Sequence, residues 1–241
     1  MTYLLLILSV AAGVAVFLLF KPEDKRKIKL LISFSGAYVF AITVLHLLPE
    51  VYGTSSRDAA HSHHLSIGML ILLGFFLQIL LEFFSHGIEH GHAHADSSGA
   101  LPIGMMLGLC IHAFIEGMPL GGGTDDQARQ VLLVGIIMHN IPVSIVLLSM
   151  LLHNGLGLTR AMGALAVFAL MSPLGMFLSG VIGRLSQYSH ELMAVVIGIF
   201  LHISTTILFE SSEGHRFNRR KIVAISIGAL IAIGTSHFWG E

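Results

Sequence analysis

Long apolar runs separated by short polar stretches make up most of this sequence. Eight runs come close to the length of about 20 residues that an α-helix needs to cross a bilayer. They cover residues 3–20, 30–52, 65–86, 101–123, 130–153, 158–182, 190–209 and 221–238. None of the polar stretches is long enough to fold as a domain of its own. The pattern predicts an all-α membrane protein with eight transmembrane helices in one domain, residues 1–241.

The composition agrees with a chain that lies mostly in lipid. Hydrophobic residues make up 54% of it and charged residues 11%, whereas a soluble domain carries roughly 25% charged residues. The net charge of -1 gives no sign of a nucleic-acid partner. The single Cys110 excludes an internal disulfide and a thiolate cluster. Any metal chemistry therefore depends on carboxylates and on the 15 histidines, which outnumber the 13 lysines and arginines.

The basic residues predict the orientation, because cytoplasmic loops of membrane proteins are enriched in Lys and Arg. If the chain starts outside, only three of the 13 face outward, namely Arg57, Arg129 and Arg184. The others face inward: Lys21, Lys25, Arg26, Lys27, Lys29, Arg160, Arg216, Arg219, Arg220 and Lys221. Both termini should then be outside, and residues 86–99 form a cytoplasmic loop. This loop is rich in histidine, with His86, His90, His92 and His94 as candidate metal ligands.

Several ionisable residues lie inside the apolar runs, where each costs roughly 2.5–3.5 kcal/mol and is rarely found without a partner or a function. They are His46 and Glu50 in the second run, His112 and Glu116 in the fourth, and His139, followed by Asn140, in the fifth. The two His–Glu pairs have i,i+4 spacing, so each pair projects from one helix face. Imidazole and carboxylate are ligands for Zn²⁺. Facing helices can therefore build a metal site between them at mid-membrane.

A proline follows each of three candidate ligands by three residues: Pro49 after His46, Pro119 after Glu116 and Pro142 after His139. A proline inside a helix removes the hydrogen bond to the carbonyl four residues back. The carbonyls concerned belong to Leu45, Ile115 and Met138. Non-helical backbone at membrane depth is tolerated mainly where it is buried or lines a wet cavity. The spacing predicts kinked helices that open their backbone onto a shared polar site, as in transporters with discontinuous helices.

The motifs HLLPE, HAFIEGMPLG, HNIP and FLHISTTILFE resemble those of the ZIP (Zrt/Irt-like) family of metal-ion transporters. The resemblance implies eight spans, both termini outside, a His-rich cytoplasmic loop and uptake of a divalent cation. It places His112 and Glu116 at the primary metal site, with His139 and Asn140 as the ligand pair of the fifth helix. His46 and Glu50 match the motif of the second helix.

The sequence departs from the family pattern at two positions. Ala113 stands where the family usually has Asn or Ser, and Val143 stands where many members carry a carboxylate or His that bridges two metals. These departures favour one metal ion over a binuclear centre, held by His112, Glu116 and His139 with help from Asn140 or water.

The leading hypothesis is a carrier that moves Zn²⁺, with Fe²⁺, Mn²⁺ and Cd²⁺ as further candidates, into the cytoplasm by alternating access. No prosthetic group is expected, and no G-x-x-x-x-G-K-[ST] loop is present to use ATP. One alternative is an intramembrane metal-dependent hydrolase, although no H-E-x-x-H motif is present. The other is a membrane metal sensor that uses the His-rich loop. Short loops and small size favour a bacterial inner membrane, and the sequence does not decide whether the protein is a homodimer.

For some polar residues the sequence allows two interpretations of their role. Asn140 fits a ligand and a helix-packing donor about equally well. His46 and Glu50 lie toward the outer end of their span, so a role in an outer vestibule competes with ligation. His202 fits a structural role better than ligation, and it could face the second helix. Glu82 and Glu210 are expected near the inner mouth, where they could relay the ion to the exit.

Overall fold

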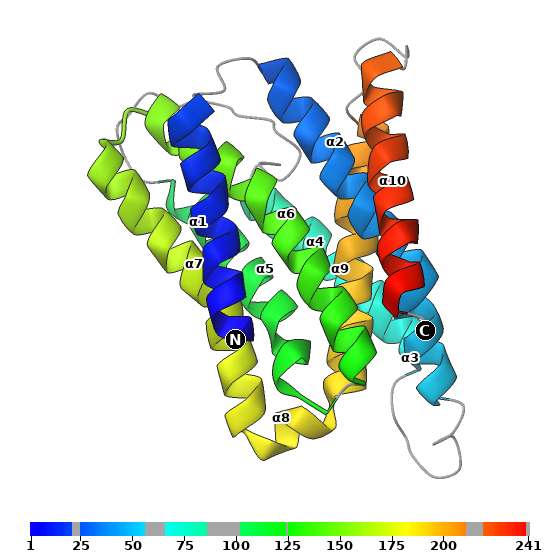
Figure 1. The fold of residues 1–241 in the computed structure, drawn as a ribbon. Coiled ribbons are helices and arrows are strands. Elements are labelled where there is room, and N and C mark those ends of the chain that lie inside the picture. Colours follow the sequence, from blue (N-terminus) through cyan, green and yellow to red (C-terminus); the bar gives the residue numbers. More distant parts are fainter. Residues whose placement is uncertain (21–24, 56–65, 86–101, 124, 211–218, 240–241) are drawn as a thin grey trace.

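The computed structural model describes residues 1–20, 25–55, 66–85, 102–123, 125–210 and 219–239. Within these ranges every regular element is a helix, as the sequence predicts (Figure 1). The first half contains α1 (Thr2–Phe20), α2 (Lys25–Ile42), the π-helical turn η1 (Thr43–Leu47), α3 (Leu48–Ser55), α4 (Ile67–Ser85) and α5 (Ile103–Gly117). The second half contains the 3-10 turn η3 (Met118–Gly121), α6 (Asp126–His153), α7 (Leu158–Val181), α8 (Gly183–Gln187), α9 (Ser189–Glu210) and α10 (Arg219–Trp239).

The described part of each of the eight apolar runs is mainly helical, and six of the resulting helices are long and apolar enough to cross a membrane. These six are Thr2–Phe20, Arg26–Gly53, Ile103–Gly121, Asp126–His153, Leu158–Val181 and Ser189–Phe209. Helix α4 contributes a shorter apolar segment, Ile67–Phe83. The most buried of the six is α6, with 72% of its apolar window inside the fold, against 28% for α1. Helix α6 therefore lies at the centre and α1 toward the lipid.

Eight of the ten described α-helices pack as two groups of four. In the first group, α1 packs on α6 and α5 packs on α7, while α1 and α6 both also contact α7. In the second group, α4 packs on α9 and α10 packs on α2, while α2 also contacts α9. The groups meet mainly where α2 packs on α6 and where α4 packs on α5. In Figure 1, α1 and α7 lie on one side and α2 and α10 on the other.

Helix α5 crosses α7 at very short range because glycine faces the partner backbone on both sides. A Cβ atom at Gly117 would lie 2.0 Å from the carbonyl oxygen of Ser172, and one at Gly175 would lie 2.0 Å from that of Phe114. Small residues allow this close approach, and dispersion contacts along the crossing stabilise helix pairs in a membrane. The crossing holds the last turn of α5 firmly against α7.

The three prolines affect their helices in different ways. Before Pro49 the second span widens into the π-helical turn η1, and before Pro119 helix α5 tightens into η3. There the carbonyl of Ile115 accepts a hydrogen bond from the backbone N–H of Met118. Pro142 lies inside α6, which continues past it.

The carbonyl that Pro142 deprives of its helical partner is used in packing between the groups. It belongs to Met138, and it accepts a hydrogen bond of 3.1 Å from the hydroxyl of Ser35 on α2. The proline spacing therefore identifies the backbone that leaves regular helix bonding. It does not identify the neighbours that then satisfy this backbone.

Candidate metal site

Helix α5 presents His112 and Glu116 to the interior, one turn apart on one face. Nε2 of His112 lies 2.8 Å from Oε1 of Glu116, and the two side chains are 2% and 0% exposed. Among the described residues nothing donates a hydrogen bond to either carboxylate oxygen of Glu116, although both oxygens are buried. A buried carboxylate is very unfavourable unless a positive charge or hydrogen-bond donors compensate it. The surroundings of Glu116 therefore suit a cation.

Helix α6 brings His139 to the same place. Its ring centroid lies 5.8 Å from that of His112, with the ring planes at 74°. Within the residues that the structure describes, His112, Glu116 and His139 form a group whose ligand atoms all lie within 4.8 Å of one another. Around a tetrahedral Zn²⁺, with bonds of about 2.0–2.2 Å, neighbouring N and O donors lie roughly 3.3 Å apart. Small side-chain rotations would thus let the three residues share one ion.

The donor set has a clear chemical preference. Two imidazoles and one carboxylate suit Zn²⁺ and related borderline cations better than Mg²⁺ or Ca²⁺, which prefer oxygen ligands. Three protein ligands leave a fourth position for water or another donor. One carboxylate neutralises only half of a dication's charge, so an ion held here would keep some residual charge. Such a site would bind an ion and also let it leave.

Gln78 on α4 also belongs to this cluster, and the sequence analysis did not predict it. Its side chain is wholly buried, and its Oε1 accepts a hydrogen bond of 3.0 Å from Nδ1 of His112. The available signal was a lone amide in the apolar stretch GFFLQILLE. A buried amide at membrane depth needs a polar partner, for the same reason that an ionisable group does.

Asn140 follows His139 in the sequence and points elsewhere. Its Nδ2 donates a hydrogen bond of 3.2 Å to the hydroxyl of Ser9 on α1, and that hydroxyl donates to the carbonyl of Leu6. Consecutive residues on a helix lie about 100° apart, so Asn140 and His139 face different neighbours. In this structure the amide ties α6 to α1, which agrees with the helix-packing reading.

His46 and Glu50 do not join the group formed by His112, Glu116 and His139. His46 lies in the π-helical turn η1, and its Nε2 is buried without a hydrogen-bond partner among the described residues. Glu50 lies in α3, beyond that turn. A π turn contains more residues than an α turn and changes the phase of the side chains that follow it. The i,i+4 spacing therefore does not align this pair as it aligns His112 with Glu116.

His202 on α9 pairs with Glu82 on α4. The two are joined by a contact of 2.6 Å between Nε2 and Oε2, and the ring of Phe75 lies edge-on to His202 at 4.9 Å. Both of these contacts join His202 to α4. Glu82 follows Gln78 by four residues, so both project from one face of α4.

The remaining sequence predictions fall outside what the structure describes. His86, His90, His92 and His94 lie within residues 86–101, which are not described. Glu210 is the last residue of α9, and its side chain is not described either.

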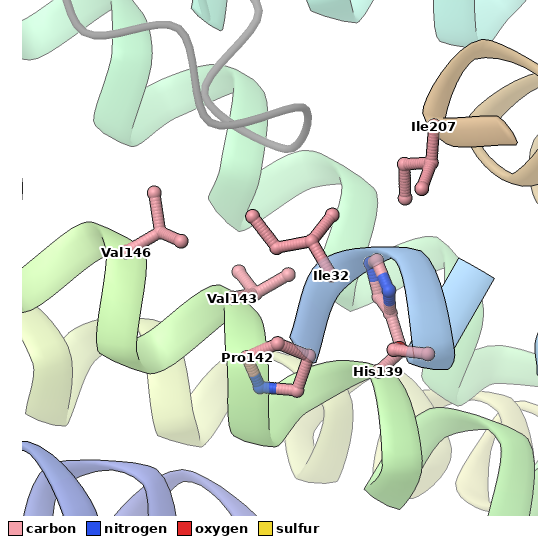
Figure 2. Close-up of a pocket in the computed structure, with 7 residues that line it drawn as sticks. Ile32, His139, Pro142, Val143, Val146 and Ile207 are labelled. Carbon is pink, nitrogen blue, oxygen red and sulfur yellow. The ribbon is translucent and has the colours of Figure 1, made fainter. Parts of the chain in front are cut away.

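An apolar pocket adjoins His139 where α2, α6 and α9 meet. Its lining consists of Ile32, Ser35, His139, Pro142, Val143, Val146 and Ile207. In Figure 2, Ile32 and Val143 face each other across the pocket, and Ile207 reaches it from α9. Val143 thus lies beside a candidate ligand and offers no donor atom. A carboxylate at this position would stand next to His139.

Comparison with known proteins agrees with this geometry. The family model described as "ZIP Zinc transporter" matches residues 89–235, which is more than half of the chain. The chain is 30% identical to zinc transporter ZIP9 of Xenopus tropicalis and 29% identical to zinc transporter ZIP9-B of Xenopus laevis. Each alignment covers 80% of this chain and 75% of the relative. It is 22% identical to zinc transporter ZIP1 of Mus musculus over 76% of this chain and 69% of the relative.

These comparisons give no support to the hydrolase and sensor alternatives. The three relatives are vertebrate proteins, so they do not support a bacterial inner membrane. Six apolar helices of spanning length make the protein a multi-pass membrane protein. The family match, the relatives and these helices lead to one assignment: the chain belongs to the ZIP zinc transporter family.

Proposed function

We propose that this protein carries Zn²⁺ across a membrane into the cytoplasm and binds the ion through His112, Glu116 and His139. One observation carries the proposal. Three buried side chains with the donor atoms that Zn²⁺ prefers converge within 4.8 Å in the interior of a multi-pass membrane protein. The relatives are named as zinc transporters. Fe²⁺, Mn²⁺ and Cd²⁺ are further candidate substrates, because Fe²⁺ and Cd²⁺ accept imidazole and Mn²⁺ accepts the carboxylate.

We propose that transport follows alternating access. The candidate ligands belong to the group α1, α5, α6 and α7, whereas the group α2, α4, α9 and α10 packs against them mainly through two helix pairs. Such a division suits a relative movement of the two groups, which would expose the ion first to one side of the membrane and then to the other. The exchange of water for protein ligands would then occur at the contact between the groups.

The proposed topology is one domain of eight spans over residues 1–241, with α4 and α10 added to the six long apolar helices. Both ends of the chain lie on the outer side in this arrangement. Two observations support it: the described part of every apolar run is mainly helical, and α1 begins at the same end of the molecule at which α10 ends (Figure 1). The unequal division of Lys and Arg sets the direction.

We propose that one ion is bound at a time. Ala113 is buried next to His112 without a donor atom, and Val143 lines the pocket beside His139. Neither can bridge a second metal. With Asn140 bonded to Ser9, a water molecule is the better candidate for the fourth ligand.

The cytoplasmic loop with His86, His90, His92 and His94 is proposed as a metal buffer beside the inner mouth of the carrier. Deletion of residues 86–94 tests this separately from transport. Zinc uptake into liposomes should stay near the wild-type rate, and the number of Zn²⁺ ions bound to the purified protein should fall. An unchanged number of bound ions would remove the loop from consideration as a buffer.

Reconstitution tests the main proposal. Purified protein in liposomes should accumulate radioactive zinc above the level of protein-free liposomes, and unlabelled Zn²⁺ should compete. Glu116→Ala in the same liposomes should reduce uptake to that background. Wild-type protein that is folded and inserted but moves no zinc would end the proposal.

A further inference from the structure

The contact between Gln78 and His112 differs from the other contacts of the cluster. All three candidate ligands come from α5 and α6, whereas Gln78 comes from α4 in the other group of helices. The Gln78 side chain is wholly buried, and a buried amide without a hydrogen bond is unfavourable. The hydrogen bond of 3.0 Å from Nδ1 of His112 to its oxygen therefore stabilises it.

The two nitrogens of His112 face in opposite directions. Nε2 lies 2.8 Å from Oε1 of Glu116, on the side of the candidate ligands, whereas Nδ1 points to α4. An imidazole that binds a metal through one nitrogen carries its proton on the other. An acceptor for that proton fixes both the tautomer and the ring orientation, and it makes the ligand nitrogen more basic. The amide oxygen of Gln78 is such an acceptor. The lone pair of Nε2 then faces a carboxylate oxygen, so the two atoms suit a shared cation.

We propose that Gln78 is the positioning residue of the metal site. Its oxygen accepts the hydrogen bond that Nδ1–H of His112 donates, and this bond holds the Nε2 lone pair toward the ion. This inference rests on the proposed zinc transport and adds to it a residue from the second group of helices. Because the support comes from that group, it holds only while α4 and α5 keep their present contact. A movement of one group past the other removes the acceptor and lowers the affinity for the ion, so ion binding is coupled to the arrangement of the helices.

A matched control is available at the other main contact between the two groups, where α2 packs on α6. The hydroxyl of Ser35 on α2 also bonds across the two groups, but it ends on the backbone carbonyl of Met138 and not on a candidate ligand. Ser35→Ala removes a hydrogen bond between the groups and leaves the ring of His112 supported. Gln78→Leu removes the acceptor itself. Gln78→Glu keeps an acceptor at the same distance along the side chain.

The experiment measures zinc uptake in liposomes and equilibrium Zn²⁺ binding to the purified protein by competition with a chelator. Loss of a residue that hydrogen-bonds to a metal ligand lowers metal affinity roughly 10- to 100-fold. We therefore expect Gln78→Leu to raise KM and Kd for Zn²⁺ about tenfold or more, with a smaller change in maximal rate. Gln78→Glu should stay near wild type or bind more tightly, and Ser35→Ala should keep the wild-type KM. For Mn²⁺, which depends more on the carboxylate, Gln78→Leu should change KM much less.

The results separate this proposal from the proposed function. If wild type moves zinc and Gln78→Leu keeps the wild-type KM and Kd, Gln78 positions nothing and zinc transport stands. If Gln78→Leu and Ser35→Ala raise KM equally, or if Zn²⁺ and Mn²⁺ are affected equally, Gln78 only joins the helices. If the leucine variant does not fold, the same KM and Kd measurements are made on Gln78→Met, which keeps the length of the side chain and also lacks the amide oxygen. A wild type that moves no zinc contradicts both proposals.

Discussion

Two His–Glu pairs with the same spacing have different surroundings in this molecule. His112 and Glu116 lie on a regular α-helix, face His139, and are almost completely buried. His46 lies in a π-helical turn, Glu50 follows in α3, and neither belongs to that group. The first pair has a regular helix on which i,i+4 residues align, and a facing helix that supplies a third donor. The second pair lacks the regular helix. Equal spacing in a sequence therefore predicts equal geometry only where the helix type is also equal.

The largest difference between the pairs should appear when their carboxylates are removed. We expect Glu116→Ala to lower zinc uptake at least about 100-fold, because even residues that only support a ligand are worth roughly 10- to 100-fold. Glu50→Ala is the matched control and should leave uptake within about twofold of wild type, as for substitutions away from a site. Uptake of radioactive zinc in liposomes measures both. Equal losses in the two variants would show that the pairs act together and that the contrast between them is false.

The rigidity of the helix beneath the first pair can be tested at Gly117. A methyl group there meets the carbonyl of Ser172, and overpacking of this kind costs about 1–3 kcal/mol. Gly117→Ala should therefore lower the midpoint of thermal unfolding in detergent. It should also weaken zinc binding, since it pushes the turn that carries Glu116 away from α7. Gly53 follows Glu50, and a Cβ there meets nothing within 4 Å, so Gly53→Ala should leave both quantities unchanged. A tolerated Gly117→Ala would mean that α5 is free to shift.

The apolar side of the site can be changed at Val143. A carboxylate beside His139 would add a second negative charge near the ion, and we expect Val143→Glu to raise zinc affinity roughly tenfold or to raise the number of bound ions. Val143→Gln is the control, because glutamine has nearly the same size as glutamate and carries no charge. Equilibrium zinc binding to the purified protein measures affinity and stoichiometry together. If neither changes, Val143 does not stand at the family's bridging position.

The smallest effect is expected at His46. Its Nε2 is buried without a hydrogen-bond partner among the described residues, so replacing the ring removes no such bond. His46→Ala should keep zinc KM within about twofold of wild type, whereas His112→Ala should raise it strongly. Uptake at several zinc concentrations distinguishes the two variants. A strong loss at His46 would place it on the ion's route.

The apolar runs could be predicted from the sequence, because mean hydropathy over about 20 residues depends on the composition of one helix at a time. The alignment of His112 with Glu116 in the fourth span could be predicted for the same reason, since i,i+4 alignment depends only on the local helix. The hydrogen-bond partners of single polar residues could not be predicted. Gln78 lies 34 positions before His112, and Glu82 lies 120 positions before His202. The direction of Asn140 toward Ser9 depends on where α1 packs against α6.

The sequence by itself determined that the chain is helical and embedded in lipid, because the length and apolarity of each run leave few alternatives at membrane depth. It also identified the candidates for metal chemistry, because charged and imidazole groups are rare in such runs. Only the tertiary structure decided which of these residues meet. A π turn, a close crossing at glycine and the contact between two groups of helices set the positions of side chains that are far apart in the chain, and no local pattern encodes those distances.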